Sequence, residues 1–212
     1  MTPESQGGMF RSSVELAQAD AYHLTADLTD GKVTNGVNDE KVSRTSYLFN
    51  TSLAEQIDVF WSHVGGSTSL LGVKFQFMGG SRTGNATGHK MAITAAMGGN
   101  EHETDSSPKV EFDISSQEFQ FLYGFRFNPS ILVYSNLSYG KYSFDGKVSS
   151  SDSSINGLKP NYDAKIFALL TGLEATVGPV LGKLELGAQR LDVTDTDEIF
   201  GFFWGWSLGF SW

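Results

Sequence analysis

The chain has 212 residues, which is enough for one domain, and it carries a formal net charge of −9. We expect no nucleic-acid partner, because such a partner requires a basic surface. The absence of cysteine excludes a disulfide framework and thiolate metal ligands. No apolar run approaches the roughly 18 residues of a membrane-spanning helix. The mean hydropathy of −0.18 still permits strands that alternate apolar and polar residues.

The first part of the chain gives the weakest structural signals. Residues 1–8, rich in small and polar side chains, predict a flexible lead. An extended segment is compatible with residues 10–26, where Val14 and Leu16 share a face, although the alanine content also permits an amphipathic helix. Polar residues 29–41 follow and contain Asp-Gly and Asn-Gly pairs, which favour turns.

From Tyr47 onward the sequence alternates between apolar residues and small or polar residues. Successive side chains of a strand point to opposite faces, so this alternation predicts strands. The predicted strands lie within residues 47–53, 57–62, 71–77, 90–97, 118–127, 131–139, 167–177, 180–189 and 201–212. In residues 118–127 five aromatic side chains fall on one face, which a soluble core of this size does not explain.

The connections between these strands alternate in length, as they do in barrels with short turns at one end and long loops at the other. The short connections are residues 54–56, 128–130 and 178–179. The long, polar connections, predicted to be exposed loops, are residues 29–41, 98–108 and 145–162. Two connections break this rule. Residues 79–88 form a long connection at the short-turn end, and residues 65–67 form a short one at the long-loop end.

The last segment has the most distinctive pattern. One face carries Phe202, Trp204, Trp206, Leu208, Phe210 and Trp212, and the other is mostly glycine and serine. Tryptophan and phenylalanine settle at the boundary between membrane and water, so the aromatic face is suited to lipid.

This segment resembles the closing strand of bacterial outer-membrane β-barrel proteins. In that family an aromatic last residue, preceded by aromatic or aliphatic residues at alternate positions, forms an assembly signal. The corresponding residues here are Trp204, Trp206, Leu208, Phe210 and Trp212, although the usual last residue is phenylalanine. With the other segments included, the resemblance covers roughly the whole chain.

The resemblance implies an all-β, antiparallel, up-and-down transmembrane β-barrel in the bacterial outer membrane. It also implies that the partners are membrane lipid, lipopolysaccharide and the barrel assembly machinery. Single-chain bacterial barrels have even strand numbers. We therefore predict ten strands over residues 9–212, with residues 10–26 as the tenth. The alternative is eight strands, which requires residues 47–61 to form one strand.

Eight charged residues fall on the face predicted to point away from lipid. They are Asp58, Lys74, Lys90, Glu118, Arg126, Glu174, Lys183 and Glu185. Charges at membrane depth face a lumen and pair with one another, because an isolated ion there is costly. Barrels of about eight strands are filled by side chains. We therefore expect a narrow, charge-filled lumen in a structural or surface-interaction protein, with a narrow channel for small solutes as the alternative.

A hydrolase at the barrel rim is a further alternative. His63 lies near one rim, and Asp192, Asp195 and Asp197 lie near another, but no spacing reproduces the paired motif of the omptin-type outer-membrane proteases. We therefore expect no enzymatic activity and no cofactor.

The polar loops offer other candidate sites. Glu101, His102, Glu103 and Asp105 carry oxygen and imidazole ligands for a divalent cation. Their spacing fits no fixed calcium motif, so we interpret them as a solvated acidic loop without a metal. An unidentified extracellular ligand of the loops remains compatible with the sequence.

Overall fold

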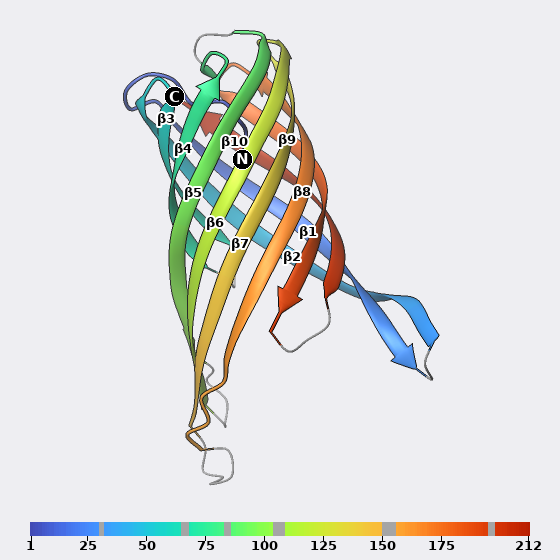
Figure 1. Ribbon diagram of the computed structural model, residues 1–212. Coiled ribbons are helices and arrows are strands. Elements are labelled where there is room, and N and C mark those ends of the chain that lie inside the picture. The colour runs from blue at the N-terminus through green and yellow to red at the C-terminus, as the bar shows by residue number, and fades with distance from the viewer. Residues whose placement is uncertain (30–31, 65–67, 83–85, 104–108, 150–155, 195–197) are drawn as a thin grey trace.

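The computed structural model is a closed barrel of ten antiparallel strands (Figure 1). Each strand pairs with its neighbour in the chain, and β1 closes the barrel by pairing with β10. The strands are β1 Ser12–Thr29, β2 Lys32–Ala54, β3 Ile57–Val64, β4 Ser69–Met78, β5 Gly88–Glu103, β6 Lys109–Asn128, β7 Ile131–Ser149, β8 Asn161–Val177, β9 Val180–Val193 and β10 Ile199–Ser211.

The structure describes residues 1–29, 32–64, 68–82, 86–103, 109–149, 156–194 and 198–212. In these ranges the predicted ten-strand, up-and-down barrel is confirmed. The eight-strand alternative is wrong, because β2 ends at Ala54 and β3 begins at Ile57. Among the described residues, no helix is long and apolar enough to cross a membrane.

The closing pair of strands joins the two ends of the chain. Val14 lies opposite Phe210 and Leu16 lies opposite Leu208 in the β1–β10 register. Beyond the last rung, the backbone groups of Ser12 and Trp212 donate to each other over 3.0 Å. Residues 10–26, for which the sequence also permitted a helix, therefore contribute to a strand, and closure pairs its backbone groups on both sides.

The outside of the barrel carries an apolar belt. On β6 the outward side chains from Phe119 to Phe127 are aromatic, and Phe119 is 54% exposed. This stretch matches the roughly 9–11 residues that a strand needs to cross a membrane. Toward the other end of β6 the outward residues become polar, beginning with Gln117. So large an exposed apolar surface is the surface of a transmembrane barrel, in which it contacts lipid.

The strands extend well beyond this belt, so the predicted loops are wrong over residues 32–41, 98–103 and 145–149, whereas residues 156–160 form a connection as predicted and residues 104–108 and 150–155 lie outside the described residues. Strand β5 continues to Glu103, β7 continues to Ser149, and β2 already begins at Lys32. The Asn35-Gly36 pair, which favours a turn, instead lies opposite Thr25 and Ala26 of β1. Beyond the apolar belt both faces of each strand meet water. The strands therefore continue to pair there, although their sequences show no apolar alternation.

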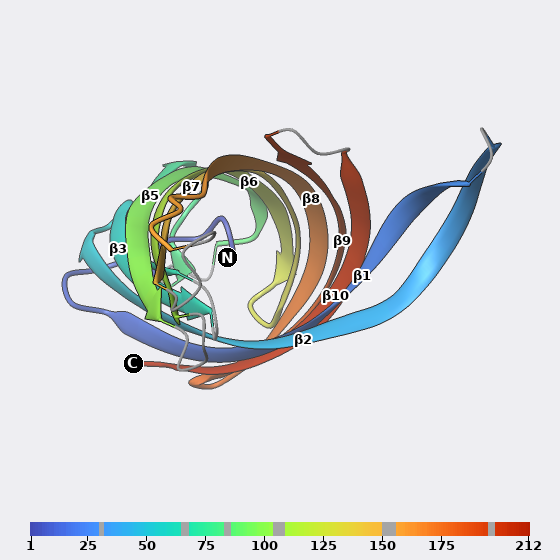
Figure 2. The same ribbon diagram turned by 90° about the horizontal axis from the view of Figure 1, so that it is seen from below.

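The first residues of the chain differ from the predicted flexible lead. Figure 2, which looks along the barrel, places the N-terminus inside the ring of strands. Residues 2–7 are buried there, and Glu4 and Ser5 are 0% exposed. The barrel interior supplies partners for their polar groups, so the segment is held rather than solvated.

If the belt faces lipid, the loss of folding free energy caused by an outward-facing arginine on β6 should depend strongly on its position along the strand. Phe121→Arg places a charge in the middle of the lipid-facing stretch and should destabilise the folded barrel by about 2–4 kcal/mol. Ser115→Arg, on the same face but beyond the belt, should cost about 0–1 kcal/mol. Urea unfolding of both variants in lipid vesicles measures the difference, and equal costs would contradict the belt.

Candidate functional site: the filled barrel interior

The N-terminal segment is fixed inside the barrel by hydrogen bonds to three strands. The Ser5 hydroxyl donates to Asp58 Oδ1 of β3 over 2.6 Å, and the Gln6 amide donates to the same carboxylate. The Ser5 amide donates to Gln76 Oε1 of β4 over 2.6 Å. The Gln6 side-chain amide donates to the Ser13 hydroxyl of β1. These hydrogen bonds therefore attach the segment to the side of the wall formed by β1 to β4.

Glu4 is the centre of the ion pairs that hold this segment. Arg126 Nε donates to Glu4 Oε1 over 2.7 Å, and Arg126 Nη2 donates to Glu4 Oε2 over 2.5 Å. Lys90 Nζ lies 3.4 Å from the same carboxylate. Arg126 also donates to Glu174 Oε1 over 3.0 Å. A bidentate arginine–carboxylate contact is among the stronger ion pairs, and burial on both sides protects it from water.

Further ion pairs surround this centre. Lys74 Nζ lies 2.9 Å from Asp58 Oδ2 and donates to the Glu4 carbonyl oxygen. Lys183 pairs with Glu15 of β1. All these charged strand residues lie within a few positions of the strand ends that border the short turns and the start of β1. Each buried charge has an opposite partner, which low dielectric requires.

The structure brings six of the eight predicted lumen charges into ion pairs. These six are Asp58, Lys74, Lys90, Arg126, Glu174 and Lys183. The other two also point inward but accept hydrogen bonds from tyrosines. Glu118 accepts from the Tyr142 hydroxyl, and Glu185 accepts from the Tyr134 hydroxyl.

Three charged members of this cluster were missed in the sequence. Glu4 lies in the segment taken as a flexible lead, where no periodicity marks an inward side. Arg82 lies in the turn between β4 and β5. Glu15 did have a signal, because it falls between Val14 and Leu16, and strict alternation places it on the lumen side.

Arg82 reaches into the lumen from its turn. Its Nη2 donates to Glu174 Oε2 over 2.8 Å, and its backbone amide donates to the Ser5 carbonyl oxygen over 2.9 Å. Burial lowers the pKa of the Arg82 guanidinium, but the charges of Glu174 and Glu4 outweigh burial and raise the pKa. The side chain is therefore a permanent cation that binds both the wall and the N-terminal segment.

The cluster as a whole is electrically balanced. Its five cations are Lys74, Arg82, Lys90, Arg126 and Lys183, and its five anions are Glu4, Glu15, Asp58, Glu174 and Glu185. Balance of this kind lowers the electrostatic cost of burying ten charges together. The N-terminal segment supplies one of the five anions, so the strands alone carry an excess of positive charge.

An apolar layer lies beyond the ion pairs, toward the extended strands. Phe60, Leu70 and Ala96 form a buried cluster, against which Met1 and Leu48 pack. Gly72 makes room for it, because a Cβ atom there would lie 2.4 Å from the Phe60 ring. The interior therefore contains a salt-bridged layer and a hydrophobic layer in series.

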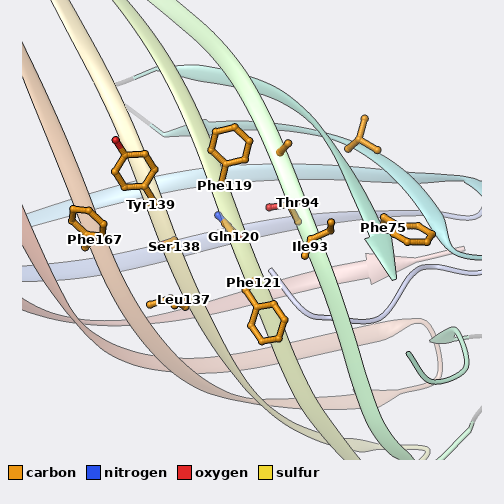
Figure 3. Close-up of a pocket in the computed structure, with 12 residues that line it drawn as sticks. Phe75, Ile93, Thr94, Phe119, Gln120, Phe121, Leu137, Ser138, Tyr139 and Phe167 are labelled. Carbon is orange, nitrogen blue, oxygen red and sulfur yellow. The ribbon is translucent and has the colours of Figure 1, made fainter. Parts of the chain in front are cut away.

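The outer surface contains an apolar groove over strands β4 to β8. It has a volume of about 620 Å³ and is lined by Phe75, Ile93, Phe119, Tyr139 and Phe167, among others (Figure 3). The small side chain of Ala95 also lines the groove, among these larger residues. The groove lies within the apolar belt and is therefore part of the surface that faces lipid.

The final strand places its aromatic face outward, as its alternation predicts. Trp204, Leu208, Phe210 and Trp212 are exposed, and Trp206 is partly exposed. The opposite face, which includes Gly205 and the 4% exposed Ser207, points to the lumen.

The rim residues considered for catalysis do not form a described triad. His63 Nδ1 lies 2.9 Å from the Ser69 hydroxyl, and its ring stacks on Trp61, but no described carboxylate hydrogen-bonds to it. Asp192 instead pairs with Arg190. Asp195 and Asp197 lie outside the described residues.

The acidic residues considered for metal binding lie on the strand extensions. Glu101 lies opposite Asp113, and Glu103 pairs with Lys109 at 2.7 Å. The His102 side chain and Asp105 lie outside the described residues. The described residues contain no group of three metal-binding side chains.

Solved structures of three bacterial barrels are similar to this chain. Ail, the attachment invasion locus protein of Yersinia pestis, is 12% identical with a TM-score of 0.43, and the match covers 97% of this chain and 100% of that chain. Neisserial surface protein A is 10% identical with a TM-score of 0.41, covering 94% and 96%. The N-terminal β-barrel domain of Pseudomonas aeruginosa OprF is 9% identical with a TM-score of 0.35, covering 93% and 97%. No protein-family model and no curated protein matches the sequence.

The ion pairs of Glu4 predict a large effect of one substitution. Glu4→Ala leaves Arg126 with one carboxylate partner and Lys90 with none among the described ion pairs. Removing one partner of a buried ion pair costs about 3–5 kcal/mol. The free energy of unfolding in urea should fall by that order, whereas Glu55→Ala, in the exposed β2–β3 turn, should leave it unchanged. A loss below 1 kcal/mol would show that the segment is not held by these pairs.

Proposed function

We propose that the protein is an integral outer-membrane barrel with a closed lumen, which acts as a structural or surface-interaction protein rather than as a channel. The observation that carries this proposal is the N-terminal segment, which lies in the lumen with Glu4 paired to Arg126 and Lys90. The proposed location rests on the closed barrel and its apolar belt, because such barrels belong to the bacterial outer membrane.

Two layers support the closed lumen. At the short-turn end, five buried ion-paired or hydrogen-bonded carboxylates face five cations. Beyond them, Phe60 and Leu70 pack with the side chains of Met1 and Leu48. Small barrels have interiors that side chains can fill, whereas porins with open channels use about 16–18 strands. A hydrated ion would have to displace both layers.

The strand extensions support a role in surface interaction. Strands β5, β6 and β7 continue past the belt and carry exposed carboxylates there. These carboxylates are Glu101, Glu103, Glu111, Asp113 and Asp145, with Lys109 and Lys147 among them. A rigid paired sheet displays such side chains at fixed spacing, which suits the binding of a partner with complementary basic groups.

Planar-bilayer recording tests the closed lumen. The full-length protein should give no steady unitary conductance. Deletion of residues 2–7 removes the Glu4 carboxylate and leaves five cations facing four anions, so the deletion variant should conduct and should prefer anions. Circular dichroism of the variant checks that the barrel still folds.

A different result would favour the channel alternative. If the full-length protein shows steady conductance, and Glu185→Gln changes its ion selectivity, the lumen is a solute pathway and the proposed closed function is wrong. Glu55→Gln, outside the lumen, serves as the matched control for a carboxylate lost elsewhere.

We further propose that Trp204, Trp206, Leu208, Phe210 and Trp212 form the signal that the barrel assembly machinery binds. Their outward face on the closing strand supports this role, since they stay accessible at an unpaired strand until β1 pairs with β10. Membrane lipid and lipopolysaccharide are the partners proposed for the apolar belt, including the groove around Ala95.

Assembly into proteoliposomes that contain the purified machinery tests this signal. Phe210→Ser and Trp212→Ser together should slow insertion at least several-fold. Phe127→Ser removes a similarly exposed aromatic residue from the short-turn end of β6 and should not slow insertion. The same slowing in liposomes without the machinery would instead indicate a general loss of lipid affinity.

A further inference from the structure

A second hollow lies at the short-turn mouth of the barrel, on the opposite side of the ion pairs from the apolar layer. Its volume is about 270 Å³, and its lining includes three arginines, Arg11, Arg82 and Arg126. The turns at Pro129 and Gly178 also contribute to it, so it opens at the end where the chain termini lie. No carboxylate side chain is among its lining residues in the described part of the chain.

Arg82 has hydrogen-bonding capacity to spare in this hollow. Its side chain is 10% exposed, and its Nη2 donates to Glu174 and to the Thr2 hydroxyl. Its Nε and Nη1 atoms are buried and have no hydrogen-bond partner. Leaving a buried donor unsatisfied costs about 1–3 kcal/mol, and more for a charged group. A ligand oxygen or a water molecule that accepts from these two donors would remove that cost.

The other two arginines of the hollow, Arg126 and Arg11, differ in how many of their N–H donors are already used. Arg126 uses four of its five N–H donors, because it donates twice to Glu4, once to Glu174 and, through Nη1, once to the Pro129 carbonyl oxygen. Arg11 is exposed and makes no described ion pair. The ten side-chain charges of the buried cluster already balance, so Arg11 adds a positive side-chain charge at the mouth.

We propose that this mouth binds a small oxyanion, a phosphate or phosphate monoester, between Arg82 and Arg11. A tetrahedral oxyanion offers several acceptor oxygens in different directions, which matches donors that approach from a turn and from the start of β1. Guanidinium groups are well suited to phosphate because they are always charged and present several donors in a plane. The side-chain carboxylates paired with these arginines are already engaged by cations, Glu4 by Arg126 and Lys90 and Glu174 by Arg82 and Arg126.

Calorimetric titration of the full-length protein with inorganic phosphate tests the site. The protein is held in zwitterionic nanodiscs in phosphate-free buffer, and glycerol 3-phosphate serves as a second probe. We expect one saturable site per chain for each. Arg11→Gln should weaken binding about tenfold without changing the stability of the barrel, since Arg11 has no described partner to lose.

Two further variants make the test decisive. Arg82→Gln should weaken binding at least tenfold, and it should still fold because Glu174 keeps Arg126 and Lys183 as partners. Arg190 lies on β9 and pairs with Asp192 and Glu198, away from the hollow. The Arg190→Gln variant should therefore bind phosphate like the unaltered protein. Absence of saturable binding, or equal affinities of the Arg11 and Arg190 variants, would overturn the proposal even if the Arg82 variant failed to fold.

Discussion

The whole architecture depends on the need to pair every backbone amide and carbonyl in a medium without water. A sheet satisfies this need in hydrocarbon when it has no free edge, and here the pairing of β1 with β10 removes the last one. Closure in turn fixes which side of each strand faces lipid. Because the side-chain period is two, a one-residue slip of β10 at this seam would move Leu208 into the lumen and Ser207 into lipid.

Closure also creates the interior in which the charged residues must be accommodated. Each lysine or arginine there would be costly alone, so the wall places acids within reach of bases on a neighbouring strand or across one intervening strand. The balance is completed by Glu4, which belongs to no strand. The same segment contributes Met1 to the apolar layer. The closed lumen therefore depends on a piece of chain that pairs with no strand, and the wall is electrostatically incomplete without it.

The wall of the barrel was predictable from the sequence, because lipid on one side and a lumen on the other impose a strict alternation. Residues such as Phe121 and Trp61 showed the outward face, and Asp58 and Lys74 showed the inward one. Three kinds of feature were not predictable. The strand extensions have polar residues on both faces, so no alternation marks them. The Asn35-Gly36 pair has a strong local preference for a turn, which pairing with β1 overrides. Glu4 and Arg82 lie in segments whose course is set by tertiary contacts alone.

The separation in sequence between Glu4 and its partners has a consequence for the order of folding. Lys90 lies on β5 and Arg126 on β6, far along the chain from Glu4. Contacts of such long range form late, because the entropy of closing the intervening loop must be overcome first. The ion pairs of Glu4 therefore complete the interior only after the distant strands β5 and β6 have come within reach of the first residues. The interior is thus the part of the fold that demands the most distant contacts, whereas the wall is built from strands that follow one another in the chain.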